Sequence, residues 1–259
     1  MFAILSDIHA NLEALTAVLA DIDRHGVERI VCLGDLVGYG PDPVACIDLV
    51  REKCEVVLMG NFEYVAVFEP ERFSDSPRRA YDWLRQLDVY ERRRPYLAEL
   101  PPSHHEGRSL YVHGSARNPL HEYVFPEDIY NQRKMGHIFD LIAHVCFCGH
   151  THIQGVLIDH AGRYDVKTRL FHPTSGEGEY AYFAPEEISH EWRLDACKTI
   201  INVGSVGQPR DGPRAGYVLV EGELVRFRRV EYDVETTIRK IRDIPDLEDF
   251  FGGRLREGR

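Results

Sequence analysis

Residues 2–9 read FAILSDIH, a short apolar run that ends in an aspartate and a histidine two positions apart. The run from Phe2 to Ser6 predicts a buried β-strand, because near-continuous apolar character over a few residues is typical of strands covered on both faces. Asn11 can then cap a helix, whose apolar positions between Leu12 and Ile22 recur every three or four residues. A strand followed by such a helix indicates the start of a βαβ unit.

Four more apolar runs end in the same way, with a glycine or a histidine where each predicted strand stops. They are Ile30–Leu33 before GD, Val56–Met59 before GN, Leu110–Val112 before His113, and Val145–Cys148 before GHTH. Since the carboxyl ends of neighbouring strands converge on one crevice in an open α/β sheet, we expect the polar residues after them to meet at one site. Beyond Gly149 the predicted strands are linked by short turns, which indicates a more antiparallel half.

Length and charge limit the class of protein. The chain has 259 residues, 44% of them hydrophobic, and 31 Lys and Arg against 42 Asp and Glu, for a formal charge of −11. We expect residues 1–259 to form a single domain, with a helical insert at about 66–100 and a loop or cap insert at about 173–191. No apolar run reaches the roughly 18 residues of a membrane span, and the acidic balance argues against extended nucleic acid as a partner.

The cysteines and the N-terminus predict a location. The six cysteines form no CxxC pair, and most lie in apolar runs, which is typical of reduced thiols in a core. The N-terminal MFAILSDIHA has no basic region ahead of its apolar run, unlike a signal peptide. We therefore expect a cytoplasmic protein.

The residues that follow the five predicted strands have the chemistry of metal ligands. Carboxylates, imidazoles and an amide oxygen, with no thiolate among them, suit Mn, Fe, Zn, Ni or Co better than copper(I) or an iron–sulfur cluster. Two carboxylates, four histidines and one asparagine are too many for one catalytic ion, whereas two ions that share a bridging carboxylate use them all. The candidate ligands are Asp7, His9, Asp35, Asn61, His113, His150 and His152.

These motifs, in the order DxH, GD, GN, H and GHxH, resemble those of the calcineurin-like metallophosphoesterases. The resemblance spans about residues 2–220 and includes GSVGQPR at 204–210, which is similar to the closing loop of the small bacterial and archaeal phosphodiesterase branch. It implies an α/β fold of the α+β sandwich type, with two mixed β-sheets packed face to face and flanked by helices. The dinuclear metal site would lie at the strand C-terminal ends.

The resemblance also assigns roles within this set. It implies two divalent or trivalent transition-metal ions and attack on phosphorus by a hydroxide that both ions share. In this assignment Asp35 bridges the ions, and Glu63 orients a ligand histidine. The first ion would be held by Asp7, His9 and His152, and the second by Asn61, His113 and His150.

One position departs from the family pattern. The family motif GNH(D/E) carries a histidine that protonates the leaving oxygen, and this chain has Phe62 there. Because general acid catalysis typically contributes about 10²- to 10⁴-fold, its loss favours leaving groups that depart without a proton. We therefore expect a small phosphorylated substrate, a nucleotide or an activated phosphodiester, and a dry space over the second ion at Phe62.

Three further residues are candidates for the chemistry, and each has an ordinary alternative. His121 can replace the missing acid or be a surface histidine. Arg210 and Arg117 can donate to a phosphoryl oxygen or lie exposed on the surface. Two other functions are compatible with the pattern: a serine/threonine-type phosphomonoesterase, that is, a protein phosphatase, and a metal-binding scaffold without turnover.

Overall fold

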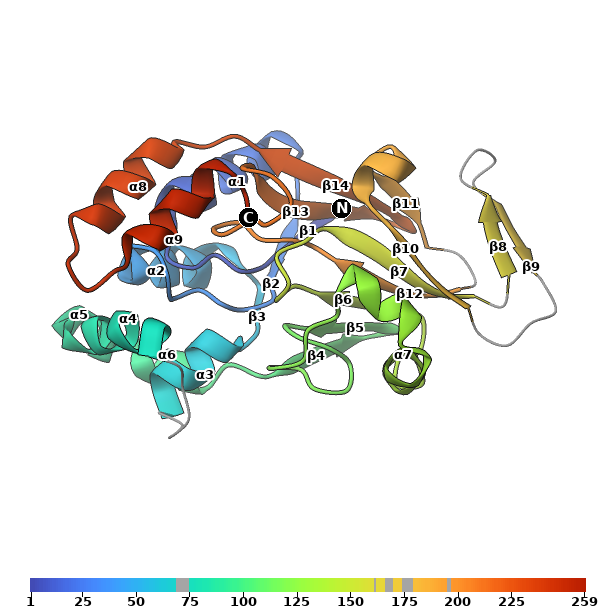
Figure 1. The fold of residues 1–259 in the computed structure, drawn as a ribbon, viewed down its shortest axis with the longest axis horizontal. Helices are drawn as coiled ribbons and strands as arrows, with labels where there is room; N and C mark the ends of the chain where they lie inside the picture. The colour runs from blue at the N-terminus through green and yellow to red at the C-terminus, as the bar shows by residue number, and fades with distance from the viewer. Residues whose placement is uncertain (69–74, 161, 166–169, 174–178, 195–196) are drawn as a thin grey trace.

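Two six-stranded sheets form the centre of the computed structural model, which describes residues 1–259 except 69–74, 161, 166–169, 174–178 and 195–196 (Figure 1). The first sheet has the order β11 (Glu191–Arg193), β14 (Leu224–Val230), β13 (Ala215–Glu221), β1 (Phe2–Leu5), β2 (Arg29–Cys32) and β3 (Val56–Val57). The second has the order β10 (Glu179–Phe183), β7 (Gly155–His160), β12 (Lys198–Asn202), β6 (Val145–Cys148), β5 (Ser109–Val112) and β4 (Ser103–Glu106). A hairpin of β8 (Gly162–Asp165) and β9 (Leu170–Pro173) stands apart from both.

Each sheet is mixed, as predicted. Strands β1, β2 and β3 run parallel in the first sheet, and β5, β6 and β12 run parallel in the second. The remaining pairs in both sheets are antiparallel. The parallel strands are those that carry the predicted site residues at their carboxyl ends, so this topology gathers those residues.

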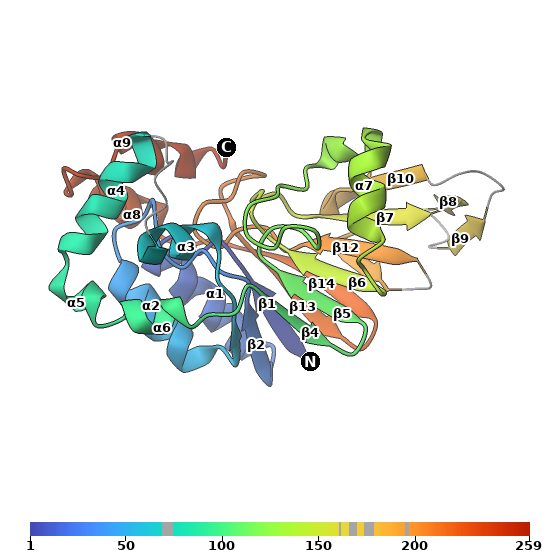
Figure 2. The ribbon, with the colours of Figure 1, turned by 90° about the horizontal axis from the view of Figure 1, so that it is seen from below.

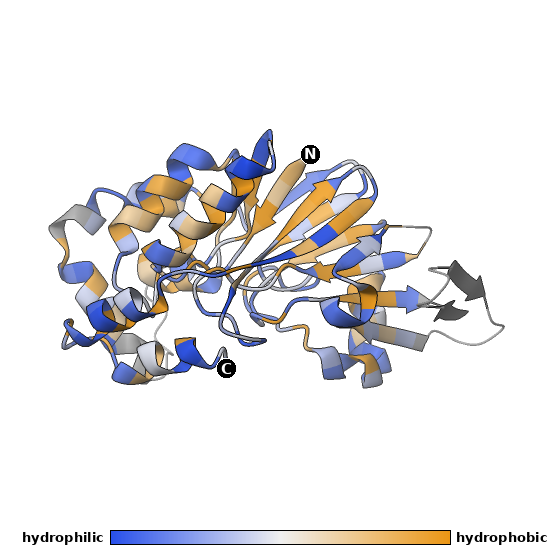
Figure 3. Ribbon diagram, turned by 90° about the horizontal axis from the view of Figure 1, so that it is seen from above, coloured by the Kyte–Doolittle hydropathy of each residue, from blue (hydrophilic) through white to orange (hydrophobic). Residues whose placement is uncertain are grey.

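The core lies in three layers, because the buried strands alternate their apolar side chains between two faces. Between the sheets, Ile4 and Val218 from the first pack with Phe147 and Ile201 from the second. Helices α1 (Leu12–Arg24) and α2 (Pro43–Lys53) cover the outer face of the first sheet, and α7 (Gln132–Phe139) covers the second. Figure 2 shows this layering, and Figure 3 shows hydrophobic residues gathered on the strands, with hydrophilic residues on the outer sides of the helices beside them.

Residues 66–100, where we expected a helical insert, contain helices joined by short turns in their described part. They contain the end of α3 (Asn61–Phe68), then α4 (Asp75–Gln86), α5 (Asp88–Glu91) and α6 (Arg94–Ala98). At the other end of the chain, α8 (Val234–Arg242), α9 (Asp249–Gly253) and the 3₁₀ turn η3 (Arg254–Arg256) form a small cluster. None of the helices in the described ranges is long and apolar enough to cross a bilayer.

The prediction of a loop or cap at 173–191 was wrong for the part that is described. Residues 179–183 form β10, which pairs with β7 and extends the second sheet, and residues 185–188 form the 3₁₀ turn η2. The side chains of β10 alternate, with Tyr180 and Tyr182 packed toward α7 and with Ala181 and Phe183 facing the core between the sheets. Residues 174–178 of the predicted insert lie outside the described residues.

Candidate metal centre

The structure brings all seven predicted ligands to the carboxyl ends of β1, β2, β5 and β6 and to the start of α3. Six of them are buried, and the seventh, Asn61, is half-buried. Six form two groups whose ligand atoms lie within 4.8 Å of one another, the first made of Asp7, His9 and His152, and the second of Asp35, His113 and His150. Asn61 adjoins the second group through its Oδ1, 3.0 Å from His113 Nε2.

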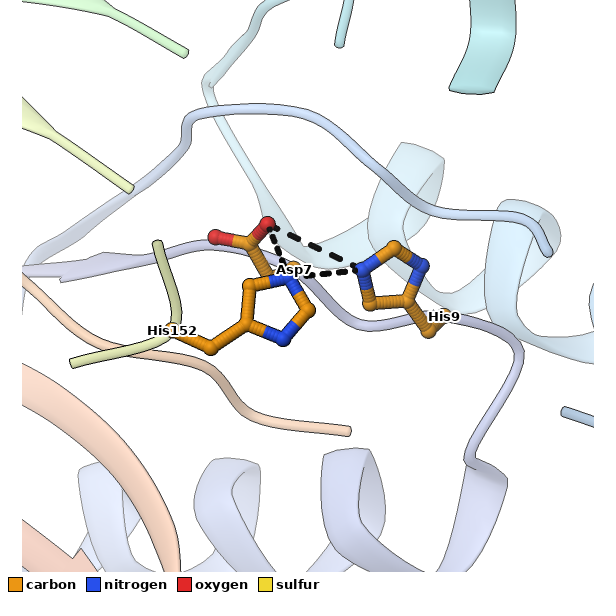
Figure 4. Close-up of side chains that lie close together, drawn as sticks. All are labelled: Asp7, His9 and His152. Carbon is orange, nitrogen blue, oxygen red and sulfur yellow. Dashed lines mark hydrogen bonds and ion pairs between the residues drawn. The ribbon is translucent and has the colours of Figure 1, made fainter. Parts of the chain in front are cut away.

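The first group has its imidazoles fixed by backbone carbonyls. The Nε2 atoms of His9 and His152 lie 3.1 Å apart, and Asp7 Oδ1 lies 3.1 Å from His152 Nε2 and 3.7 Å from His9 Nε2 (Figure 4). On the outer side, His9 Nδ1 donates to the Val37 carbonyl at 3.1 Å, and His152 Nδ1 donates to the Gln208 carbonyl at 2.6 Å. Both Nε2 lone pairs are therefore free for a ligand, as in metal sites whose outer hydrogen bonds set the tautomer.

The second group is held differently. His113 Nε2 lies 3.0 Å from His150 Nδ1 and 3.3 Å from Asp35 Oδ2. The outer nitrogens, His113 Nδ1 and His150 Nε2, are buried without a hydrogen-bond partner among the described residues. Instead, the ring of Tyr123 stacks face to face on His150, with centroids 3.7 Å apart and an angle of 13°.

Asp35 lies between the two groups. Its Oδ2 is 3.6 Å from His9 Nε2 and 3.3 Å from His113 Nε2, so one oxygen faces an imidazole of each group. Its other oxygen, Oδ1, accepts the backbone N–H of Phe62 at 2.9 Å, which fixes the carboxylate. This placement suits an oxygen shared by two ions.

The donor set fits two metal ions. Asp7 Oδ1 and Asp35 Oδ2 are buried and have no hydrogen-bond partner in the described structure, although buried polar atoms are normally paired. Burial lowers the pKa of His150 to about 3 and the pKa of His152 to about 4, so both imidazoles are neutral at pH 7. Nearby carboxylates, Asp35 first, raise the pKa of His113 to about 9 against the effect of burial, so the second group attracts positive charge. Two pairs of imidazoles with ring nitrogens 3.0–3.1 Å apart beside carboxylates form a natural cation site.

The backbone at these residues is unusual. Five of the seven predicted ligands have positive φ angles, a region that non-glycine residues seldom occupy. Such conformations persist where the surroundings enforce them, and they cluster at functional sites. Gly149 contributes to this tight packing, because a Cβ atom at this position would overlap the carboxylate of Asp7 and the hydroxyl of Ser6. The five are Asp7 (55°), His9 (47°), Asp35 (54°), His150 (67°) and His152 (64°).

Glu63 holds two ligand-bearing loops together. We had expected this residue to orient a ligand histidine, but its described hydrogen bonds go to backbone N–H groups. Its carboxylate accepts the N–H groups of Asp35 at 2.7 Å, Leu36 at 2.7 Å, Val37 at 3.1 Å and Gly60 at 2.9 Å. Burial, with the charge of Asp35, raises the pKa of Glu63 to about 7 despite these hydrogen bonds. The motif shows an acidic residue here, but which backbone groups it binds depends on the fold.

Phe62 lies beside the first group and not over the second, contrary to our expectation. Its ring centroid is 4.9 Å from that of His9, 4.7 Å from that of Tyr39 and 5.6 Å from that of Tyr81. The side chain is only 7% exposed. Helix α3 begins at Asn61, and the ring of Phe62 packs against Gly38, on the side of His9 and Tyr39.

The other three candidates lie at different distances from the centre. Arg117 is exposed and donates from Nε to Glu122 at 3.1 Å, so it has the contacts of a surface residue. The ring of His121, in the same loop, lies 5.6 Å from Tyr64, and burial with the charge of His113 lowers its pKa. Arg210 lies beside the first group, where its backbone N–H donates to the His152 carbonyl at 3.1 Å.

The sequence analysis missed four residues that contact the centre. Gln208 and Ser205 belong to the GSVGQPR segment, whose signal was present, and Ser205 Oγ donates to the Asp7 carbonyl at 2.8 Å. Tyr39 packs its ring 4.7 Å from that of His9, and Tyr123 stacks on His150. The two tyrosines had no signal of their own, because Tyr39 lies beyond the GD motif in its loop and Tyr123 lies ten residues after His113.

Known proteins are similar to this chain in sequence, in architecture or in both. The model of the family described as calcineurin-like phosphoesterase matches residues 1–154. An uncharacterized protein of Methanocaldococcus jannaschii is 33% identical over 272 residues, which cover 100% of this chain and 98% of that protein. The crystal structure of a metallophosphoesterase from Sphaerobacter thermophilus is also 33% identical, with 100% and 99% coverage and a TM-score of 0.75. A hypothetical protein from Pyrococcus horikoshii, 19% identical with 100% and 99% coverage, has a TM-score of 0.68.

Proposed function

Because the chain belongs to the calcineurin-like phosphoesterase family, whose members hydrolyse phosphoesters with metal ions, we propose that it cleaves phosphodiester or nucleotide phosphoanhydride bonds. In this proposal Asp7, His9 and His152 hold one ion. Asn61, His113 and His150 hold the other, and Asp35 bridges them. When bound, two such ions act as Lewis acids on phosphoryl oxygens and lower the pKa of water.

The chain's own residues would fix the orientation of the ligand imidazoles and add positive charge beside the substrate. His9 and His152 have fixed tautomers because their outer nitrogens donate to carbonyls, so little rearrangement is needed when the substrate binds. Burial is the main cause that lowers the pKa of His152, and the charge of Arg210 also lowers it, which supports a role for this arginine near the centre. Arg210 would therefore bind a non-bridging phosphoryl oxygen.

Phe62 is the observation that supports this choice of bond. The position that carries an acidic histidine in the family motif here carries a hydrocarbon ring, enclosed by His9, Tyr39 and Tyr81. An alkoxide leaving group then lacks a proton donor at this position, whereas a phosphate or an aryl oxide departs without one.

Exposed aromatic side chains beside the second group suit a flat leaving group. Tyr123, 40% exposed, stacks on His150, and Phe125, 37% exposed, stacks on Tyr123 with centroids 5.2 Å apart. Aromatic rings in this arrangement offer a stacking surface to a nucleobase or an aryl group.

A series of substrates with graded leaving groups tests the proposal. The enzyme, loaded with Mn, Fe, Zn, Ni or Co in turn, is assayed with bis-p-nitrophenyl phosphate, a dinucleoside tetraphosphate, alkyl and aryl monoesters, and a phosphopeptide. We expect kcat/KM to fall steeply as the pKa of the leaving group rises. Alkyl monoesters cleaved as fast as activated diesters, with a flat dependence, would contradict the proposal and point to another acid such as His121.

Installing the family residue gives a second test. Phe62→His should raise the ratio of monoester to diester hydrolysis, by part of the roughly 10²- to 10⁴-fold that general acid catalysis supplies. Phe68→His is the matched control, because Phe68 is 52% exposed at the end of the same helix. An unchanged ratio in Phe62→His, in a variant that still binds two ions, would argue that the missing acid does not set the preference.

A further inference from the structure

Arg254, at the start of η3, is a cation with no anion beside it. Its guanidinium lies over the ring of Tyr39, 4.5 Å from the centroid, and 5.4 Å and 5.5 Å from the centroids of Phe250 and Phe251. Nε donates to Gln208 Oε1 at 2.6 Å, whereas Nη2 is enclosed and makes no hydrogen bond within the described structure. Within the same residues, no carboxylate forms an ion pair with this side chain. A buried donor without an acceptor is costly, so the site lacks one acceptor.

Two contacts connect Arg254 to the metal centre. The ring of Tyr39 is packed between Arg254 and His9, with centroids of the two rings 4.7 Å apart. Gln208, which accepts from Arg254 through its side chain, accepts from His152 through its backbone carbonyl. The C-terminal turn thus lies one side chain away from both histidines of the first group.

Arg210 follows Gln208 by two residues, and its backbone N–H donates to the His152 carbonyl at 3.1 Å, so the segment that contacts Arg254 carries a second positive charge. Burial lowers the pKa of Arg254, and the charge of Arg210 lowers it further, so the two guanidinium groups repel each other. The Tyr39 phenol opposes this effect. Among the described residues, neither Arg210 nor Arg254 forms an ion pair with a carboxylate. In a chain with 42 acidic and 31 basic residues, two neighbouring arginines without a carboxylate are not explained by composition.

We propose that Arg210 and Arg254 form a subsite for a second phosphate, the one next to the phosphate that is cleaved. The subsite makes a nucleoside di- or polyphosphate the substrate class, an inference that rests on the proposed cleavage of phosphoanhydrides. Guanidinium groups bind phosphate through paired, charge-assisted hydrogen bonds, and an anion between two arginines removes their mutual repulsion.

A packing role alone does not explain all the observations at Arg254. Stacking of Arg254 on Tyr39, Phe250 and Phe251 would anchor α9 and η3, and cation–π contacts of this kind are common. Packing does not require a second arginine beside the first, nor an enclosed Nη2 without an acceptor. A neighbouring phosphate accounts for both observations.

Binding of two ligands that differ by one phosphate tests the subsite. Calorimetry with the metal-loaded protein, freed of excess metal, compares adenosine monophosphate with α,β-methylene adenosine diphosphate, which is not hydrolysed. We expect the diphosphonate to bind about tenfold more tightly, in line with one charged hydrogen-bonded contact. Arg254→Gln should remove most of this ratio. Arg256→Gln is the matched control on the same turn, since Arg256 is exposed and pairs with Glu235 at 2.7 Å.

The outcomes separate this inference from the proposed function. Equal affinity for the two ligands in the wild type, or a ratio retained in folded Arg254→Gln, would overturn the subsite. If Arg254→Gln does not fold by circular dichroism, Arg210→Gln decides in the same way. Failure of the proposed function would be seen in the substrate series, whereas the binding ratio needs no turnover. Loss of the ratio in both arginine variants, with the ratio kept in Arg256→Gln, supports the subsite.

Discussion

The two ligand groups are built from the same residue types but are held by different means. In the first group, both imidazoles donate their outer N–H to backbone carbonyls, of Val37 and Gln208. In the second, the outer nitrogens of His113 and His150 have no such partner among the described residues, and an aromatic ring covers His150. One group is oriented by hydrogen bonds and the other by packing.

This difference predicts an order of metal binding. Outer hydrogen bonds to ligand histidines are typically worth about 10- to 100-fold in metal affinity, because they fix the ring and its tautomer before the ion arrives. The first group has two of these bonds, and the described part of the second group has none. We therefore expect the first ion to be held tightly and the second to exchange with solution.

Metal removal should produce the largest effect and reveal that order. During dialysis against increasing chelator, we expect one ion per chain to leave first, with turnover lost at that stage, and the other ion to leave later. Metal content by plasma emission and activity, measured on the same samples, check this. Mn or another transition ion should restore turnover. Full activity after exhaustive chelation would refute metal dependence, and loss of both ions together would refute the difference between the groups.

Asp35→Asn should have the next largest effect, because it acts on both groups at once. One carboxylate oxygen faces His9 and His113, so the amide weakens both sites, and the loss of kcat/KM should exceed the about 10- to 100-fold of an outer partner. Asp21→Asn is the control, since Asp21 is buried but binds Tyr217 and Arg228 instead. Two bound ions and wild-type rate in Asp35→Asn would exclude a bridging role.

The central strands and the convergence of the candidate ligands were the parts that the sequence could predict. In β1 and β6, apolar residues run without interruption and polar ligands follow at once, so the pattern and the chemistry mark the same point in the chain. Among the strands that were missed, β4, β10 and β11 lie at the edges of the two large sheets, where one side of the strand lacks a partner and polar residues are tolerated.

The contacts of the supporting residues could not be predicted, since they join positions distant in sequence, even where the segment itself had a signal, as at Gln208. Gln208 reaches His152 from 56 positions away, and Arg254 reaches Gln208 from 46 positions further along the chain. Glu63 was correctly expected next to the site, but its hydrogen bonds to the loop at Asp35 span 28 residues. A motif marks the residues that bind a ligand. The residues that position those ligand-binding side chains differ in type, so they form no motif.

A smaller change should sharpen the comparison by acting on the second group alone. Tyr123→Leu removes the ring that stacks on His150, and with no outer hydrogen bond in the described structure this imidazole then loses its main restraint. We expect the second ion to bind about tenfold more weakly, the lower end of the effect of an outer partner, with the first unchanged. Tyr123→Phe keeps the ring and should keep the affinity. Tyr130→Leu, at a residue that is 83% exposed, controls for loss of a surface tyrosine.

Stepwise metal titration of the three variants separates the two sites. A weaker first ion in Tyr123→Leu would mean that the groups are coupled through Asp35 more strongly than their separate supports suggest, whereas unchanged binding of both ions would show that packing by Tyr123 does not hold His150.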